Sequence, residues 1–189
     1  MEIIFLISKF IFKYKFIKVN LKQKKIFEVI NALLQIKKFP EYFQDHTIRY
    51  GFLNYVAKYS LAADKYLITE KALNHLIQNN FLKNGSLRKG IKSKKNGFTY
   101  EHPIPSNIIS SEILKFRENK NMINKILKWS DLIVVLTSEE NLCLTDSGFE
   151  RKMPNNWKFF KSNPFARYEL AGLLEKPLLD VDVYGQVTR

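Results

Sequence analysis

The sequence predicts an α+β protein that is mainly helical, with an N-terminal helical unit followed by a basic β-hairpin and a small strand–helix core. Apolar residues recur at helical spacing through much of the chain, which predicts the helices. One short unbroken apolar run, LIVVL at 132–136, is typical of a buried strand. The stretch SLRKGIKSKKNGFTYEH, residues 86–102, has the Asn-Gly pair of a β-hairpin.

The chain is expected to fold as one compact domain in three parts: an extension at 1–21, a helical unit at 22–82, and a hairpin with an α/β core at 83–189. In the extension, Phe12, Tyr14 and Phe16 alternate with lysines, which predicts a half-buried strand. The same lysines interrupt the apolar run, so it is not predicted to cross a bilayer. It lacks the features of a secretory signal, and we expect a cytoplasmic protein. Contact with a membrane surface is a minor alternative.

Helices are predicted from the position of apolar residues and of helix-ending residues. In the segment 22–38, Ile26, Ile30 and Leu33 fall on one face and Pro40 follows. The same reasoning predicts helices at 48–61, 69–80, 106–119 and 120–130.

Two further helices are predicted from capping residues. Thr137 and Glu140 have the spacing of a capping box, so a helix should begin there and stop at Gly148. Asn163 and Pro164 should start the last helix, in which Arg167, Tyr168 and Glu169 pack.

A net charge of +13 is the strongest compositional feature. Residues 41–80 are neutral, whereas residues 81–100 carry +6. The charge is therefore concentrated, which indicates a polyanionic partner: nucleic acid, with DNA favoured over RNA. The only cysteine, Cys143, excludes an internal disulfide and a multi-cysteine zinc site.

The predicted hairpin carries most of that local charge. One strand is expected at 86–92 and the other from Phe98, with the Asn96-Gly97 pair closing the tip. Lysines outnumber arginines, which favours contact with the phosphate backbone over base recognition. The candidate nucleic-acid-binding residues are Lys83, Arg88, Lys89, Lys92, Lys94 and Lys95.

Of the three histidines, His102 is the one whose backbone is constrained. His75 is expected on a solvated helix face and His46 ahead of a helix. Because Pro103 follows His102, the backbone of His102 is excluded from the helical region. We therefore expect His102 at the end of a strand, where the chain continues in an extended and restricted conformation. Strand alternation puts His102 on one face and Glu101 on the other.

The Glu-His pair followed by prolines, in FTYEHPIP at 98–105, resembles the opening of the HNH, or ββα-metal, nucleases. The resemblance implies that Glu101 binds a divalent metal, Mg2+ or Mn2+, and that His102 is the general base that activates water against a phosphodiester. It implies that 132–136 is the second strand and that the following helix supplies a further metal ligand, for which Asn141 and Asp146 are candidates. The chain departs from the family because no histidine follows His102 and about 30 residues separate the pair from the second strand.

Non-catalytic functions are the alternatives. Helix 69–80 followed by a basic wing at 87–101 also resembles a winged-helix DNA-binding module, in which Lys71, Asn74, His75 and Gln78 would face the major groove. A toxin-like or structural protein acting on RNA or membrane is a third class.

Overall fold

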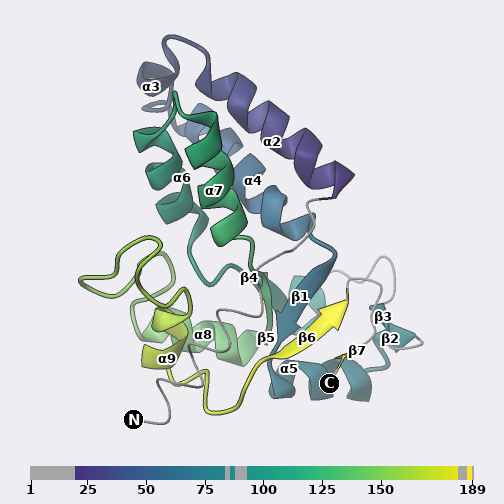
Figure 1. The fold of residues 1–189 in the computed structure, drawn as a ribbon. Coiled ribbons are helices and arrows are strands. Elements are labelled where there is room, and N and C mark those ends of the chain that lie inside the picture. Colours follow the sequence, from purple (N-terminus) through teal and green to yellow (C-terminus); the bar gives the residue numbers. More distant parts are fainter. Residues whose placement is uncertain (1–19, 84–85, 88–92, 183–186, 189) are drawn as a thin grey trace.

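The computed structural model describes residues 20–83, 86–87, 93–182 and 187–188. Over these residues the protein is α+β and mainly helical, as predicted (Figure 1). The expected strand at 1–21 lies outside the described residues, apart from the last two. The helices are α2 (Leu21–Leu34), α3 (Phe39–Tyr42), α4 (His46–Leu61), α5 (Glu70–Gln78), α6 (Ser106–Lys115), α7 (Lys120–Trp129), α8 (Ser138–Asp146) and α9 (Ala166–Leu170). The strands are β1 (Lys65–Ile68), β2 (Leu82–Lys83), β3 (Ser86–Leu87), β4 (Phe98–Glu101), β5 (Val134–Thr137), β6 (Leu179–Asp182) and β7 (Val187–Thr188).

A helical bundle forms one end of the molecule. Helices α2, α4, α6 and α7 pack together, and α3 closes the far end (Figure 1). Their inward side chains are large and apolar, so burying them stabilises the bundle by about 1.5–3 kcal/mol for each side chain. The fully buried members include Ile30, Phe52, Val56, Ile109 and Ile126.

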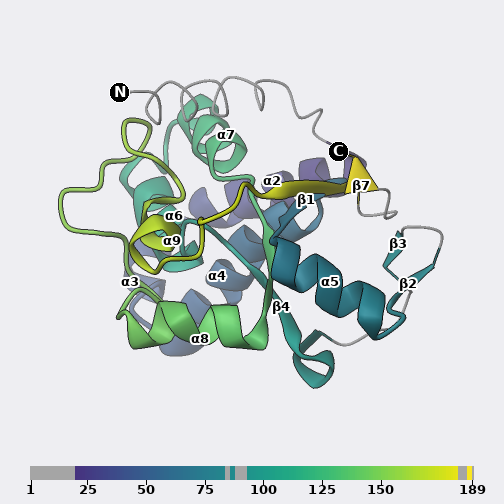
Figure 2. The ribbon, with the colours of Figure 1, turned by 90° about the horizontal axis from the view of Figure 1, so that it is seen from below.

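A five-stranded sheet forms the other end, in the order β4-β5-β1-β6-β7. Only β1 and β5 are parallel; the other neighbouring pairs are antiparallel. Helix α5 covers one face, where Ala72 and Leu76 pack on Val135. Helices α8 and α9 cover the other, where Leu144 and Tyr168 pack on strand residues (Figure 2).

The carboxyl ends of the two parallel strands are joined through one carboxylate. Thr69 follows β1 and its hydroxyl donates to Glu140 Oε2 at 2.7 Å, while the Thr137 amide at the end of β5 donates to the same oxygen at 2.9 Å. Each threonine hydroxyl in turn accepts a hydrogen bond from a backbone amide in the first turn of the helix that follows it, Thr69 from Ala72 and Thr137 from Glu140. The predicted capping box is therefore confirmed, and its glutamate also connects α5 to α8.

The strand at 98–101 is confirmed, but its expected hairpin partner is wrong. β4 pairs with β5, with Phe98 opposite Thr137 and Glu101 opposite Val134. Residues Ser86–Leu87 pair instead with Leu82–Lys83, and Ser93–Asn96 form a short 3₁₀ helix. Most of the other expected strand, 88–92, lies outside the described residues. The fully buried β5 has a paired strand on each side, β1 and β4, and β4 lies at the edge of the five-stranded sheet.

A buried polar cluster lies where bundle and sheet meet. Asp131, between α7 and β5, is only 5% exposed, and its Oδ2 accepts from Gln23 Nε2 at 2.7 Å. Within the described part of the chain, Asp131 Oδ1 and the hydroxyl of Tyr59 have no hydrogen-bond partner. Burial raises the pKa of Asp131 to about 7, the bond from Gln23 opposes the shift, and nearby Asp64 adds to it.

Candidate active site

Strands β4 and β5 and helix α8 form a strand–strand–helix unit at one edge of the sheet. The two strands are antiparallel over their whole length, and α8 begins directly after β5 and packs on both strands. This is the order of elements predicted for 98–146. The Glu101-His102 pair lies at the end of the unit nearer the helical bundle, because His102 contacts α4.

His102 lies just beyond β4 and contacts the bundle. Its Nε2 is 3.1 Å from the carbonyl oxygen of Ala57 in α4. A carbonyl can only accept, so Nε2 carries the proton and Nδ1 carries the lone pair. Burial lowers the pKa of His102 below its ordinary 6.5; the hydrogen bond to Ala57 opposes this and the Arg167 cation adds to it. The ring is therefore neutral at pH 7, with its tautomer fixed.

Glu101 lies on the sheet face covered by α8 and α9, since it pairs with Val134, a member of that face's core. Its Oε1 accepts a hydrogen bond from Nη2 of Arg167, and its side chain is 24% exposed. Burial raises the pKa of Glu101 above its ordinary value; Arg167 opposes this and the Glu150 carboxylate adds to it. At the end of β4, the side chain of Glu101 thus contacts α9 and that of His102 contacts α4, in agreement with strand alternation.

Arg167 of α9 fixes the backbone around this pair. The residue is completely buried. Its Nε donates to the carbonyl of Pro103 at 2.8 Å, and Nη1 donates to the carbonyls of Phe149 at 2.7 Å and Glu150 at 3.1 Å. Nη2 donates to Glu101 and to the carbonyl of His102. Every nitrogen of the buried cation therefore has an acceptor, which a buried charge requires.

The sequence predicted that Arg167 and Tyr168 pack in the last helix, and both are buried. It did not predict that Arg167 joins α9 to the end of β4. The available signal was a single arginine within the apolar segment FARYEL. Glu169 was also predicted to pack, but it is exposed, and its carboxylate accepts a hydrogen bond from Asn163 Nδ2 at 2.7 Å.

The expected metal ligands lie on two elements, Glu101 at the end of β4 and Asn141 and Asp146 in α8. Asn141 is half-buried in α8, and Asp146 is exposed at its last residue. Among the residues that the structure describes, no three His, Cys, Asp or Glu side chains are grouped so that they could hold a metal ion. Glu101 already pairs with a buried cation. The described carboxylates and histidines therefore do not by themselves form the Mg2+ or Mn2+ site that the resemblance implies.

The basic residues predicted to bind nucleic acid are only partly described. Lys83 lies in β2, and Lys94 and Lys95 lie in the 3₁₀ helix, where Lys95 is exposed. Arg88, Lys89 and Lys92 lie outside the described residues.

His75 does not lie on a freely solvated face as expected. It is half-buried, its ring packs against Phe81, and its Nε2 is 2.6 Å from the carbonyl oxygen of Asn96. It therefore holds the segment just before β4. Gly97 fits beside it with φ +73°, and a Cβ at this position would lie 3.0 Å from His75 Cε1. His46 is exposed at the first residue of α4, which agrees with its expected place.

No described helix is both long and apolar enough to span a membrane. No family model matches the chain, and searches of curated proteins and of solved structures find no match either.

Proposed function

We propose that the protein binds nucleic acid and hydrolyses its phosphodiester bonds, with His102 as the general base. The observation that carries the proposal is the state of the His102 ring. It is neutral, its protonated Nε2 is held by Ala57, and its lone pair is on Nδ1. Such a ring can take a proton from an attacking hydroxyl at neutral pH. Its place at the end of the first strand of a strand–strand–helix unit is the place that the HNH resemblance assigns to the base.

Glu101 and Arg167 act in this proposal as positioning residues. Arg167 binds the carbonyl oxygens of His102 and Pro103 and the carboxylate of Glu101, so three consecutive residues are fixed by one side chain. Ala57 holds the imidazole from the bundle side. A base held at both its backbone and its ring loses little freedom when substrate binds, which favours catalysis.

The charge of the chain supports a nucleic-acid substrate. A net charge of +13 attracts a polyanion, and DNA remains the favoured form. No step is assigned to a metal ion, because the described residues do not assemble its ligands. Mg2+, Mn2+ and a chelator are instead variables of the assay.

The test is cleavage of plasmid DNA and of RNA by wild type and by His102→Gln. Glutamine places an amide nitrogen near the position of Nε2, so it can keep the contact with Ala57 while removing the base. We expect His102→Gln to fold normally and to cut at least about 100-fold more slowly, since general-base catalysis contributes about 10²–10⁴-fold. His46→Gln, which changes an exposed histidine, should cut like wild type.

The pH profile gives a second readout. Because the pKa of His102 is lowered, the basic form persists below pH 6.5, and the rate should fall only at more acidic pH. Cutting by His102→Gln at the wild-type rate would refute the role of His102. If wild type cuts neither DNA nor RNA with Mg2+, with Mn2+ or with chelator, the proposed hydrolysis is wrong and only nucleic-acid binding remains proposed.

A further inference from the structure

Four aromatic rings gather where the chain after α8 returns to the bundle. Trp129 ends α7, and the rings of Trp157, Phe159 and Phe160 lie 5.8, 4.9 and 5.4 Å from it, centroid to centroid. The rings are tilted or edge-to-face, the geometry that aromatic pairs favour. All four are half-buried, so each packs on the bundle core and keeps part of its surface exposed.

Exposed lysines lie beside these rings, one in space and two in the sequence. Lys125 Nζ lies 5.1 Å from the centroid of Phe160, and Lys158 and Lys161 flank the rings in sequence and are exposed. Residues 120–129 and 151–163 together contain seven Lys or Arg and no Asp or Glu. These two segments are therefore aromatic and predominantly basic, with one of the cations, Arg151, paired to the adjacent Glu150 at 3.6 Å.

The backbone of this segment is held in an uncommon conformation. Phe160 has φ +64° and Asn156 has φ +67°, both in the left-handed region. A bulky residue adopts this region only when its surroundings compensate for the strain. The Trp157 indole donates to the carbonyl of Asn163 at 2.9 Å, and the Lys158 amide donates to Ser162 Oγ at 2.9 Å, which hold the turn.

We infer that these four rings, with Lys125, Lys158 and Lys161, form an aromatic–lysine patch that binds single-stranded nucleic acid. Bases contact the aromatic rings and phosphates contact the lysines. The inference deepens the proposed function, because it rests on nucleic acid being the ligand and assigns that ligand a surface.

The rings decide between a single strand and a duplex. Paired bases hide their faces within the stack, whereas unpaired bases can lie against an aromatic side chain. A duplex would contact the lysines but not the aromatic rings. Lysines contribute charge without bidentate base recognition, so the patch should bind with little sequence preference.

Tryptophan fluorescence tests this inference directly. The chain contains two tryptophans, and both belong to the patch. We expect titration with single-stranded oligo-dT or oligo-U, in chelator so that binding is separated from cleavage, to quench their emission. A duplex of equal phosphate concentration should quench much less.

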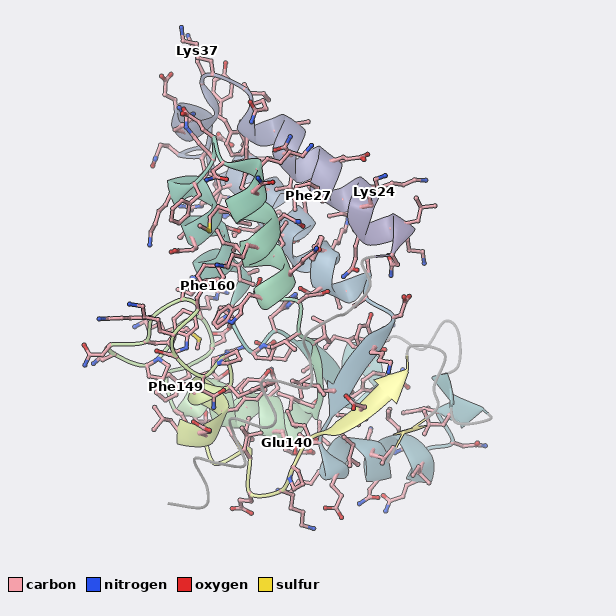
Figure 3. The ribbon with its side chains drawn as sticks, in the orientation of Figure 1. Lys24, Phe27, Lys37, Glu140, Phe149 and Phe160 are labelled. Atoms are coloured by element: carbon pink, nitrogen blue, oxygen red, sulfur yellow. The ribbon has the colours of Figure 1, made fainter. Side chains whose placement is uncertain are left out.

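Lysine variants test the charge component. A triple variant should reduce the slope of log affinity against log salt concentration by about 2, because each phosphate contact with a single strand contributes about 0.7. Its substitutions are Lys125→Ala, Lys158→Ala and Lys161→Ala. The matched control is Lys24→Ala, Lys37→Ala and Lys38→Ala combined, since these exposed lysines lie elsewhere; Lys37 is at the far end of the bundle from Phe160 (Figure 3). The control should keep the wild-type slope.

An aromatic variant tests the stacking component. Phe160→Leu keeps apolar volume, and it should weaken single-strand binding by at least about 5-fold with unchanged duplex binding, given typical stacking contributions. If both variants fold, as judged by circular dichroism, and bind like wild type, the inference is wrong. It is also wrong if single strands leave the emission unchanged or if the duplex quenches it equally.

The two proposals can fail separately. Loss of binding in the patch variants together with wild-type cutting by His102→Gln would refute the role of His102 alone. Wild-type binding by the patch variants together with loss of cutting in His102→Gln would refute the patch alone.

Discussion

Replacing Asp131 with asparagine should stabilise the protein at alkaline pH and have less effect at acidic pH. The Asp131 carboxyl is 5% exposed, one of its oxygens accepts from Gln23, and the other has no partner among the described residues. Tyr59 lies near enough for this charge to add to the burial that raises the pKa of Tyr59. Ionising Asp131 therefore places a carboxylate where only one hydrogen bond supports it, which is unfavourable.

The magnitude follows from the pKa of Asp131, which rises from the ordinary aspartate value of 3.8 to about 7 in the folded protein. The folded state keeps the proton over this interval while the unfolded state releases it, so stability falls as pH rises from about 4 to 7 and is constant above. A shift of this size corresponds to about 4 kcal/mol at pH 8 and about 2 kcal/mol at pH 5. Asparagine does not ionise, so it avoids this loss.

The assay is urea unfolding of wild type and Asp131→Asn between pH 5 and pH 8, followed by circular dichroism. We expect the difference in free energy of unfolding, variant minus wild type, to grow by about 2–3 kcal/mol across this range. Asp146→Asn is the matched control, because Asp146 is an exposed carboxylate at the end of α8 and does not contribute to the pKa shift of Asp131. A difference that does not change with pH would show that Asp131 is ionised throughout and that the argument from burial is wrong.

Two further substitutions test the contacts that hold β4. Arg167→Met removes the fully buried guanidinium and leaves its carboxylate partner unpaired. The free energy of unfolding, measured in urea, should therefore fall by about 3–5 kcal/mol. The control Arg151→Met, at an exposed ion pair, should change it by less than about 1 kcal/mol. Gly97→Ala puts a side chain at φ +73° against His75 and should lower the thermal midpoint, at a cost of about 1–2 kcal/mol. Gly51→Ala, a helical position with nothing within 4 Å of the added carbon, should instead be neutral or stabilising. Equal effects of the two glycine substitutions would contradict the contact with His75.

The local sequence pattern was sufficient to predict most helices and the strand at 132–136, although their ends differ by several residues. Thr137 and Glu140 specified the start of α8, because capping depends on residues close in sequence. Strands β1 and β6 were not predicted. The run KYLI is too short to show a period, and it becomes a strand only because β5 and β6 pair with it.

The error at the hairpin has the same cause. Asn96-Gly97 is a strong local hairpin signal, but the pairing partner of β4 comes from residues 134–137. Glu101 and His102 were identified from local residue types, and their position at a strand end is confirmed. Their actual contacts, Arg167 and Ala57, are 66 and 45 residues away in the chain, so no local pattern contained them.

The contacts around the candidate site make some of its residues replaceable and others not. Four of the five groups that Arg167 binds are main-chain carbonyls, including those of Phe149 and Glu150. The partner of the His102 ring is likewise a carbonyl. Changing the side chains at these acceptor positions leaves the acceptors in place, whereas any change of Arg167 removes all its hydrogen bonds together. Tolerance to substitution should therefore be high at Glu150, which is exposed, and low at Arg167, even though both lie against the same strand exit.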